Sequence, residues 1–283
     1  MQKIAVAIIH GIGEQKAEFA DKMIEEIKKR FASHLNHIID DPTSQLAFKP
    51  IHWAELFAER ENKLFQTIVL NKNLHFNDLR DFIIHYLGDV IAYQPVETAK
   101  QNYERVHEKI EQNLNDLVNV AGESAPLCVI SHSLGSVITS NYFYDLQFKV
   151  NHKDLEKNNL SPLEKGETLT LFYTLGTTLP LWSLRYYNFN RPINIPSANL
   201  NDFYPGLQGE WINFYDKDDV LGYPLRDIDE TYAKAVTEDR EINVGNVITS
   251  WNPLAHNAYF IDNDVINPIV EALVRVWKYV NNV

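Results

Sequence analysis

The stretch Ser131-His132-Ser133-Leu134-Gly135-Ser136 decides the fold, and it directly follows the apolar run Leu127-Cys128-Val129-Ile130. A serine that a sharp strand-to-helix turn pushes out of a sheet needs small residues two places before and two places after it, because the helix packs closely against the strand there. Here those places hold Ser131 and Gly135. Glycine is usual at both, so Ser131 departs from the pattern while keeping a small side chain. The stretch therefore predicts a nucleophile elbow with Ser133 at its apex.

Apolar runs and helical patterns alternate on either side of this stretch. Ile4–Ile9 is a continuous apolar run that ends at a glycine-containing turn, which is typical of a strand buried on both faces. Asn267 and Pro268 are typical of a cap and a first-turn proline, so they predict the start of the last helix. Strands are expected at 4–9, 47–53, 127–130, 169–175 and 211–215, a hairpin or last strand at 237–244, and helices within 19–35, 55–93, 95–117, 134–146 and 267–280. The alternation predicts an α/β fold with a mostly parallel central sheet and helices on both faces.

The domain organisation follows from length and from long insertions. The chain has 283 residues, 45% of them hydrophobic, which suffices for one large core, so residues 1–283 are expected to form a single domain. Segments 55–93 and 177–209 exceed what simple crossovers need and are candidate cap or lid insertions, whereas 151–167 is polar and predicts a surface loop.

The segment 177–209 follows the carboxyl end of a predicted strand, where open α/β sheets bind ligands. It is rich in aromatic residues, and Trp182, Tyr186 and Tyr187 are candidates for lining a substrate pocket. The alternative is that these side chains pack the loop onto the core.

Charge and cysteine content restrict the partners and the compartment. A formal charge of −12 argues against nucleic acid or an anionic membrane as a partner, because either would meet a basic surface. The lone Cys128 excludes an intramolecular disulfide and fits a reducing compartment. The chain turns into a strand after three residues and holds no apolar stretch near 18 residues, so neither a leader peptide nor a transmembrane segment is expected. These features predict a cytoplasmic protein and leave its oligomeric state open.

Ser133 needs a general base, because an unassisted hydroxyl is a poor nucleophile at neutral pH. In folds with this elbow the triad follows the chain order serine, acid, histidine. Two histidines come after Ser133, and only His256 also follows the acidic cluster at 216–219, whereas His152 lies in the polar loop. His256 is therefore the candidate base; the alternative is a surface or capping histidine.

Together these motifs resemble the α/β-hydrolase superfamily of serine hydrolases, especially its lipase and esterase branches. The resemblance extends from Ile4 to His256: His10-Gly11-Ile12-Gly13 resembles the oxyanion loop, and the loop around His256 resembles the histidine loop. The elbow is similar to that of intracellular phospholipases related to the DDHD family. The resemblance implies cleavage of a carboxylic ester, and with the aromatic insertion a lipid ester. A thioesterase or acyltransferase with the same residues, or a non-catalytic binding module, remain the alternatives.

The superfamily places its acid a few residues beyond the strand at 211–215, usually just ahead of an apolar pair. Asp219 fits this position, since Val220 and Leu221 follow it, and Asp216 is the alternative acid. The same cluster misses the spacing of a calcium-binding EF-hand, which has glycine sixth and glutamate twelfth. No metal is therefore expected here.

The oxyanion of the tetrahedral intermediate needs two preorganised N–H donors. The backbone N–H groups of Leu134 and Ile12 are the candidates, with His10, Gly11 and Gly13 shaping the loop that carries Ile12. A phosphate-binding loop is the alternative for the two glycines, but the third glycine and the later acidic residue of a dinucleotide fingerprint are missing. This chemistry requires no metal and no organic cofactor.

Overall fold

The computed structural model describes residues 1–11, 16–70, 84, 87–93, 102–149, 160–185, 189–244 and 255–283, the side chains of 255–257 excepted. Within them, six strands form one sheet in the order β2-β1-β3-β4-β5-β6, and every neighbouring pair is parallel. The strands are β1 (Ile4–Ile9), β2 (Leu46–Ile51), β3 (Leu127–His132), β4 (Leu169–Leu175), β5 (Glu210–Tyr215) and β6 (Glu238–Glu241). The predicted α/β class with a parallel sheet is confirmed.

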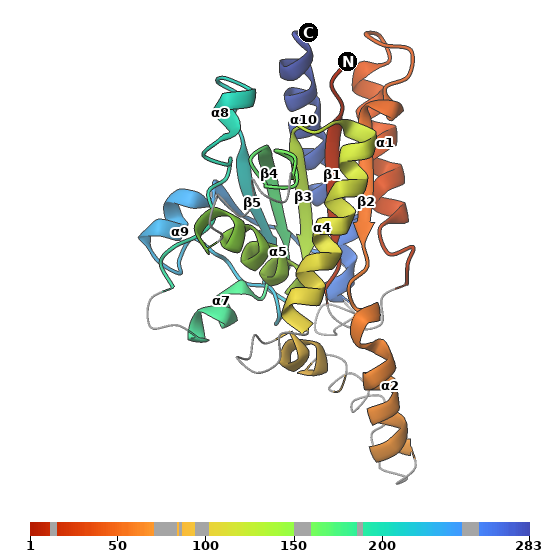
Figure 1. The fold of residues 1–283 in the computed structure, drawn as a ribbon, viewed down its shortest axis with the longest axis vertical. Coiled ribbons are helices and arrows are strands. Elements are labelled where there is room, and N and C mark those ends of the chain that lie inside the picture. Colours follow the sequence, from red (N-terminus) through yellow and green to blue (C-terminus); the bar gives the residue numbers. More distant parts are fainter. Residues whose placement is uncertain are drawn as a thin grey trace.

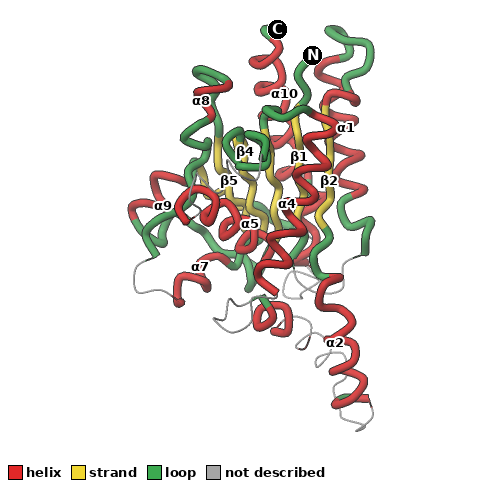
Figure 2. The backbone as a smooth tube through the Cα atoms, viewed as in Figure 1, coloured by secondary structure: helices red, strands yellow, loops and turns green. Residues whose placement is uncertain are grey.

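Helices cover both faces of the sheet (Figures 1 and 2). One face packs against α1 (Asp21–Leu35) and α10 (Asn263–Asn281), and the other packs against α4 (Asn102–Ala121) and α5 (Leu134–Tyr144). Successive residues of a strand point to opposite faces. Accordingly Ile4, Val6 and Ile8 of β1 belong to the core under α1 and α10, and Ala5, Ala7 and Ile9 belong to the core under α4 and α5. The strands β1, β3 and β4 are buried on both faces, as their continuous apolar runs predict, whereas the edge strand β6 is partly exposed.

Several short elements gather at the carboxyl ends of the strands, at the bottom of Figure 1. There α2 (Glu55–Ile68) extends away from the sheet, and α7 (Leu179–Trp182), η4 (Ser183–Arg185) and η5 (Ala255–Ile261) follow the strand ends. The remaining short elements are η1 (Thr43–Gln45), η3 (Asp145–Lys149), α8 (Leu200–Phe203) and α9 (Glu230–Ala235). The cap or lid role of segments 55–93 and 177–209 stays a prediction.

The start of the last helix was expected at Asn267, and this is wrong. The helix α10 begins at Asn263, where the Asp262 carboxylate accepts a hydrogen bond from the Asp264 N–H, and Pro268 lies inside the helix. A proline there costs a helical hydrogen bond. Val265 and Ile266, both fully buried, extend the apolar face of α10 upstream of the proline, and this burial offsets the loss.

Two other expectations concern the ends of elements. Within the segment 237–244, residues Glu238–Glu241 form a single strand parallel to β5 and not a hairpin. The segment 177–209 contains the short helices α7, η4 and α8, and Pro95, the first residue of the helix expected within 95–117, lies outside the described residues.

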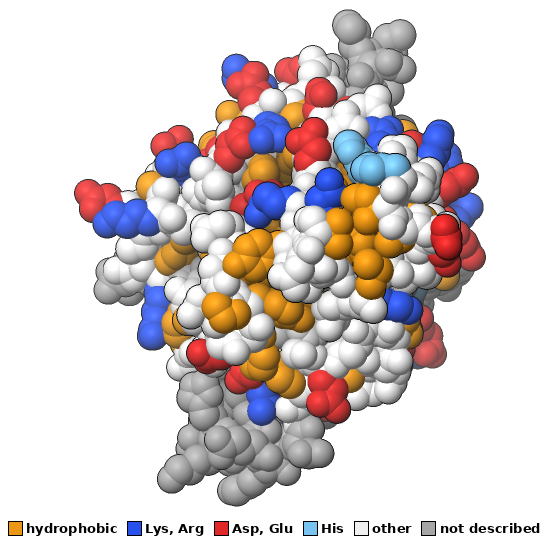
Figure 3. Space-filling view, turned by 90° about the horizontal axis from the view of Figure 1, so that it is seen from above, with side chains coloured by type: hydrophobic (Ala, Val, Ile, Leu, Met, Phe, Trp, Pro, Cys, Tyr) orange, Lys and Arg blue, Asp and Glu red, His pale blue; other side chains and the backbone are white. Residues whose placement is uncertain are grey.

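The surface at the amino ends of the strands carries acidic and basic side chains interspersed with apolar ones (Figure 3). Lys and Arg side chains do not gather into one patch on this face. Across the described part of the chain, no helix combines the length and the apolar character needed to cross a membrane.

Candidate active site

Ser133 lies at the turn between β3 and α5, in a backbone conformation that few residues adopt. Its φ is 52° and its ψ is −126°, and among the described non-glycine residues only Asn282 shares a positive φ. Such a conformation is costly for a residue with a side chain and occurs mostly at functional sites. The N–H of Ser133 donates to the carbonyl of Leu175 at the end of β4, at 2.9 Å, which holds the turn in place. This is the geometry that the nucleophile elbow requires.

The small residues around the turn are needed for close packing. A methyl group on Gly135 would lie 2.3 Å from the carbonyl oxygen of His10, so the first turn of α5 presses against the end of β1. Ser131, at the place where glycine is usual, is fully buried and its hydroxyl donates to the carbonyl of Tyr173 at 3.1 Å. The departure from glycine is thus accommodated by a hydrogen bond to the neighbouring strand.

The loop after β1 contacts the serine directly. A methyl group on Gly11 would lie 2.6 Å from Cβ and 3.2 Å from Oγ of Ser133, so only glycine lets the backbone approach this closely. Leu134 is the first residue of α5, where helical N–H groups have no partner within the helix. Ile12 and Gly13 lie outside the described residues. The oxyanion donors at Ile12 and Leu134 therefore stay predictions.

His10 is buried and bonded on both ring nitrogens. Its Nε2 accepts the backbone N–H of Trp53 at 3.2 Å, which leaves the proton on Nδ1 to be donated to the carbonyl of Gly11 at 2.6 Å. The Trp53 indole N–H donates to the carbonyl of His10 at 2.9 Å, and the two rings stack with centroids 5.2 Å apart. Burial lowers the pKa of His10 to about 3, so its ring is neutral at physiological pH. These contacts fit a residue that braces the Gly11 loop.

The two candidate acids follow β5 and are both buried, but they hold different partners. The Asp216 carboxylate accepts the backbone N–H groups of Asp218 and Val244, at 2.8 Å and 2.6 Å. One oxygen of Asp219 accepts the N–H of Leu221 at 3.0 Å, and the other accepts the hydroxyl of Tyr259 at 2.9 Å. Asp216 therefore joins two backbone segments, whereas Asp219 reaches η5.

Tyr259 connects the acid loop with η5 and with the elbow. Its hydroxyl donates to Asp219 and accepts the backbone N–H of Asp216 at 3.0 Å. Burial, with the neighbouring Asp219 charge second, raises the pKa of Tyr259 far above its ordinary value. The ring of His132, the residue before the serine, lies 5.9 Å from that of Tyr259 and 5.2 Å from that of Phe260. The segment η5 is thus packed against both the elbow and the acid loop.

His256 belongs to η5, one residue after its start, and its side chain lies outside the described residues. The structure places its backbone position one 3₁₀ turn before Tyr259. The contact between His256 and Ser133 stays a prediction.

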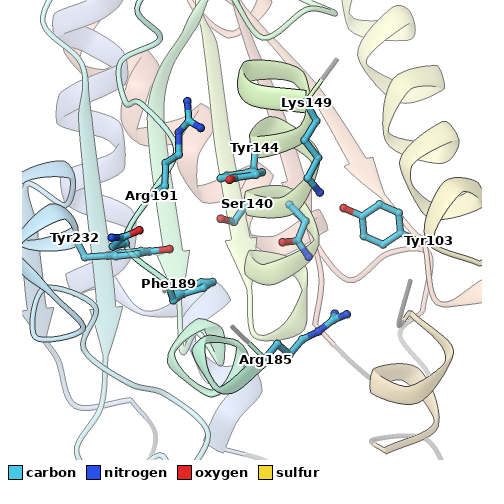
Figure 4. Close-up of a pocket in the computed structure, with 10 residues that line it drawn as sticks. Tyr103, Ser140, Tyr144, Lys149, Arg185, Phe189, Arg191 and Tyr232 are labelled. Atoms are coloured by element: carbon cyan, nitrogen blue, oxygen red, sulfur yellow. The ribbon is translucent and has the colours of Figure 1, made fainter. Parts of the chain in front are cut away.

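The candidate pocket residues are only partly described. Trp182 is 6% exposed and its ring lies 6.2 Å from that of Tyr93, while Tyr186 and Tyr187 lie outside the described residues. Trp182 does not line the hollow beside α5 that Figure 4 shows. Its role toward a substrate stays a prediction.

Tyr259 and Gly222 are site residues that sequence reasoning missed. A methyl group on Gly222 would lie 2.7 Å from the Asp219 carboxylate and 3.1 Å from the Tyr259 hydroxyl, so this glycine makes room for their contact. The sequence holds only weak signals for these two residues. Tyr259 comes three residues after the candidate histidine, and Gly222 comes three residues after the candidate acid. Within the described residues, no group of three or more histidine, cysteine or acidic side chains is arranged to hold a metal ion.

Comparisons with known proteins give little overlap in sequence. No protein-family model matches the chain, and no curated protein matches it. Among solved structures, a dienelactone hydrolase from Anabaena variabilis ATCC 29413 is similar at 9% identity with a TM-score of 0.40. The esterase domain of a Rhodothermus marinus protein is similar at 12% identity with a TM-score of 0.36. Each likeness covers 98% of this chain and 86% of the other. Likenesses at this level establish neither a family nor an activity for this chain.

Proposed function

We propose that this protein is a serine hydrolase of the α/β-hydrolase type that cleaves a carboxylic ester. The observation that carries the proposal is the turn at Ser133, a costly backbone conformation held between β3 and α5 with Gly11 packed against the hydroxyl-bearing side chain. A binding module has no use for such strain, whereas a nucleophile elbow requires it. Within the described residues the Ser133 hydroxyl is buried without a hydrogen-bond partner, as expected of a group awaiting a base.

In this proposal Asp219 orients His256, and Tyr259 supports the pairing. The support is that η5 carries position 256 and, through Tyr259, contacts the Asp219 carboxylate. Asp216 is less suited, because both of its oxygens bind backbone N–H groups that hold the loop together, whereas one oxygen of Asp219 binds a side chain of η5.

The reaction proceeds through an acyl-enzyme. Oγ of Ser133 attacks the ester carbonyl carbon while its proton passes to His256, and the N–H groups of Leu134 and Ile12 stabilise the resulting oxyanion. Collapse of this intermediate breaks the bond to the alkoxy oxygen, which takes the proton from His256 and leaves as the alcohol. Water then attacks the acyl carbon while His256 takes its proton, the bond between the acyl carbon and Oγ of Ser133 breaks, Oγ takes the proton from His256, and the carboxylic acid is released.

For the substrate we propose a lipid ester with its acyl chain against Trp182, Tyr186 and Tyr187. The support is the sequence pattern: an aromatic insertion that begins directly after β4, whose carboxyl end borders Ser133 through Leu175. A thioester, or transfer of the acyl group to an alcohol, would use the same residues.

Hydrolysis of p-nitrophenyl butyrate by the wild type and by Ser133→Ala tests this function. The wild type is expected to turn over the ester, and Ser133→Ala is expected to lose at least about three orders of magnitude in kcat. Parallel assays with a butyryl thioester, and with methanol as acyl acceptor, separate the ester, thioester and transfer reactions. Equal activity of wild type and Ser133→Ala with all substrates would contradict the proposal.

A further inference from the structure

Two adjoining hollows are lined by the carboxyl-terminal part of α5, by η3 and by residues 189–196. The first has a volume of about 210 Å³, and the second, of about 490 Å³, shares Asn190 and Arg191 with it. The lining residues of α5 begin at Ser140, seven residues after Ser133, which corresponds to roughly 10 Å along the helix. Among the described residues, neither Ser133 nor Asp219 lines either hollow. We call the two hollows together the cationic groove.

The charged side chains that line the cationic groove are all basic in the described part of the chain. Lys149, Arg185 and Arg191 line the first hollow and Lys234 lines the second. The chain holds 38 acidic and 26 basic residues, so four charged positions taken at random would be mostly acidic. Two carboxylates stand near the groove: Asp145 pairs with Lys149 at 2.8 Å, and Asp229 accepts the hydroxyl of Thr231, which lines the second hollow, at 2.6 Å. Arg191 and Lys234 form no ion pair within the described part of the chain, so the groove keeps a positive charge.

Arg191 is held by an aromatic ring rather than by an acid. Its guanidinium carbon lies 3.9 Å from the centroid of the Phe148 ring, and no carboxylate pairs with it among the described residues. Stacking on a ring fixes the plane of a guanidinium while its N–H edge stays available to an oxyanion. Arg185 likewise lies over the ring of Trp182, at 5.5 Å.

The aromatic residues that line the first hollow are buried or half-buried, whereas its charged residues are exposed. Phe189 and Tyr232 stack with centroids 5.4 Å apart and an interplanar angle of 11°, and Tyr232 is only 2% exposed. Figure 4 shows the rings of Tyr144 and Phe189 near the middle of the group, with Tyr232 and Arg191 toward one side and Arg185 and Lys149 toward the other. A ligand that fits both parts carries a negative charge at one end and an apolar body at the other.

We propose that the cationic groove binds a small amphiphilic anion, an oxyanion joined to an apolar body, at a site separate from Ser133. Carboxylate and phosphate ligands share this chemistry, because arginine donates two parallel N–H bonds to either. The apolar body lies on the half-buried rings of Phe189 and Tyr144. The proposal does not depend on ester hydrolysis, since none of its residues belongs to the proposed triad.

Isothermal titration calorimetry on the Ser133→Ala protein tests the proposal without interference from turnover. The probes are octanoate, octyl phosphate, octanol and inorganic phosphate, each below its micelle-forming concentration. Octanoate or octyl phosphate is expected to bind at least about tenfold more tightly than both octanol and inorganic phosphate, and the tighter of the two identifies the oxyanion. Equal binding of octanol would show an apolar pocket only, and equal binding of inorganic phosphate would show a simple anion site; either outcome overturns the proposal, as does no binding.

A matched pair of arginine variants locates the site. Adding Arg191→Met to the Ser133→Ala protein is expected to weaken binding of the preferred anion at least about tenfold. Arg226→Met is the control, because Arg226 is exposed, donates to the Thr237 carbonyl at 3.3 Å and lines neither hollow. Unchanged affinity in Arg191→Met, with both variants folded by circular dichroism, would place the ligand elsewhere and overturn the proposal.

Discussion

Gly11→Ala is the substitution whose effect follows most directly from the geometry of the elbow. The added methyl group would lie 2.6 Å from Cβ of Ser133, whereas carbon atoms in contact are about 3.5–4.0 Å apart, so the loop or the serine must move by about 1 Å. A misplacement of that size costs roughly 10²-fold in catalysis. Overpacking of a tight contact also costs about 1–3 kcal/mol in the free energy of unfolding. We therefore expect kcat/KM to fall about 100-fold with only a moderate loss of stability.

The assay is kcat/KM on p-nitrophenyl butyrate together with the thermal midpoint of unfolding. Gly122→Ala is the matched control, because Gly122 has a φ of +103° with nothing within 4 Å of an added methyl group. Alanine there is strained and costs about 1 kcal/mol or more in stability, but it leaves the elbow untouched. If Gly11→Ala retained activity within twofold of the wild type, the close packing of the loop on Ser133 would not matter for catalysis and the reasoning would fail.

Three further predictions follow from the site. Asp219→Asn is expected to lower kcat by about three to four orders of magnitude. Asp216→Asn weakens the hydrogen bond to the Val244 N–H and mainly lowers the free energy of unfolding, by about 1–3 kcal/mol. The reverse ranking of the two variants in kcat would make Asp216 the acid. Because burial lowers the pKa of His10 to about 3, the unfolded chain binds a proton below about pH 6.5 that the folded protein does not. The contribution of the neutral His10 ring to the free energy of unfolding is therefore complete above that pH and declines toward pH 3. Denaturant melts of His10→Asn should show a shallower decline of stability with falling pH than the wild type. An identical pH profile would refute this. Across p-nitrophenyl esters from two to eight acyl carbons, kcat/KM should rise by up to about three orders of magnitude, because each buried methylene contributes about 0.8 kcal/mol. Trp182→Ala should flatten this rise. A flat profile that Trp182→Ala leaves unchanged would contradict the lipid-ester proposal and indicate a hydrolase of small esters.

The features predicted from sequence depend on short-range patterns. Continuous apolar runs identify buried parallel strands, and the spacing of Ser131, Ser133 and Gly135 identifies the turn, because both constraints act within a few residues of the chain. The helix boundary at Asn267 failed for the opposite reason. The cap at Asp262 and the burial of Val265 and Ile266 outweigh the local signal of a proline.

The contacts that shape the site were not visible in the sequence. Tyr259 reaches Asp219 across 40 residues and the Asp216 backbone across 43, and the Trp53 backbone reaches His10 across 43. No periodicity encodes such pairs, since they depend on which strand ends meet at the edge of the sheet. The order of serine, acid and histidine selects candidates, but only the fold shows that the Asp219 carboxylate and the Asp216 backbone both contact Tyr259 of η5.

Labelling with a fluorophosphonate tests most directly the claim that Ser133 is an activated nucleophile. The probe is expected to modify the wild-type protein, with the adduct mapped to Ser133 by mass spectrometry, and to leave Ser133→Ala unmodified. Ser33→Ala, which removes an exposed hydroxyl on α1, is the matched control and should label like the wild type. Equal labelling of wild type and Ser133→Ala, or no labelling of folded wild-type protein, would contradict the account and favour a binding module.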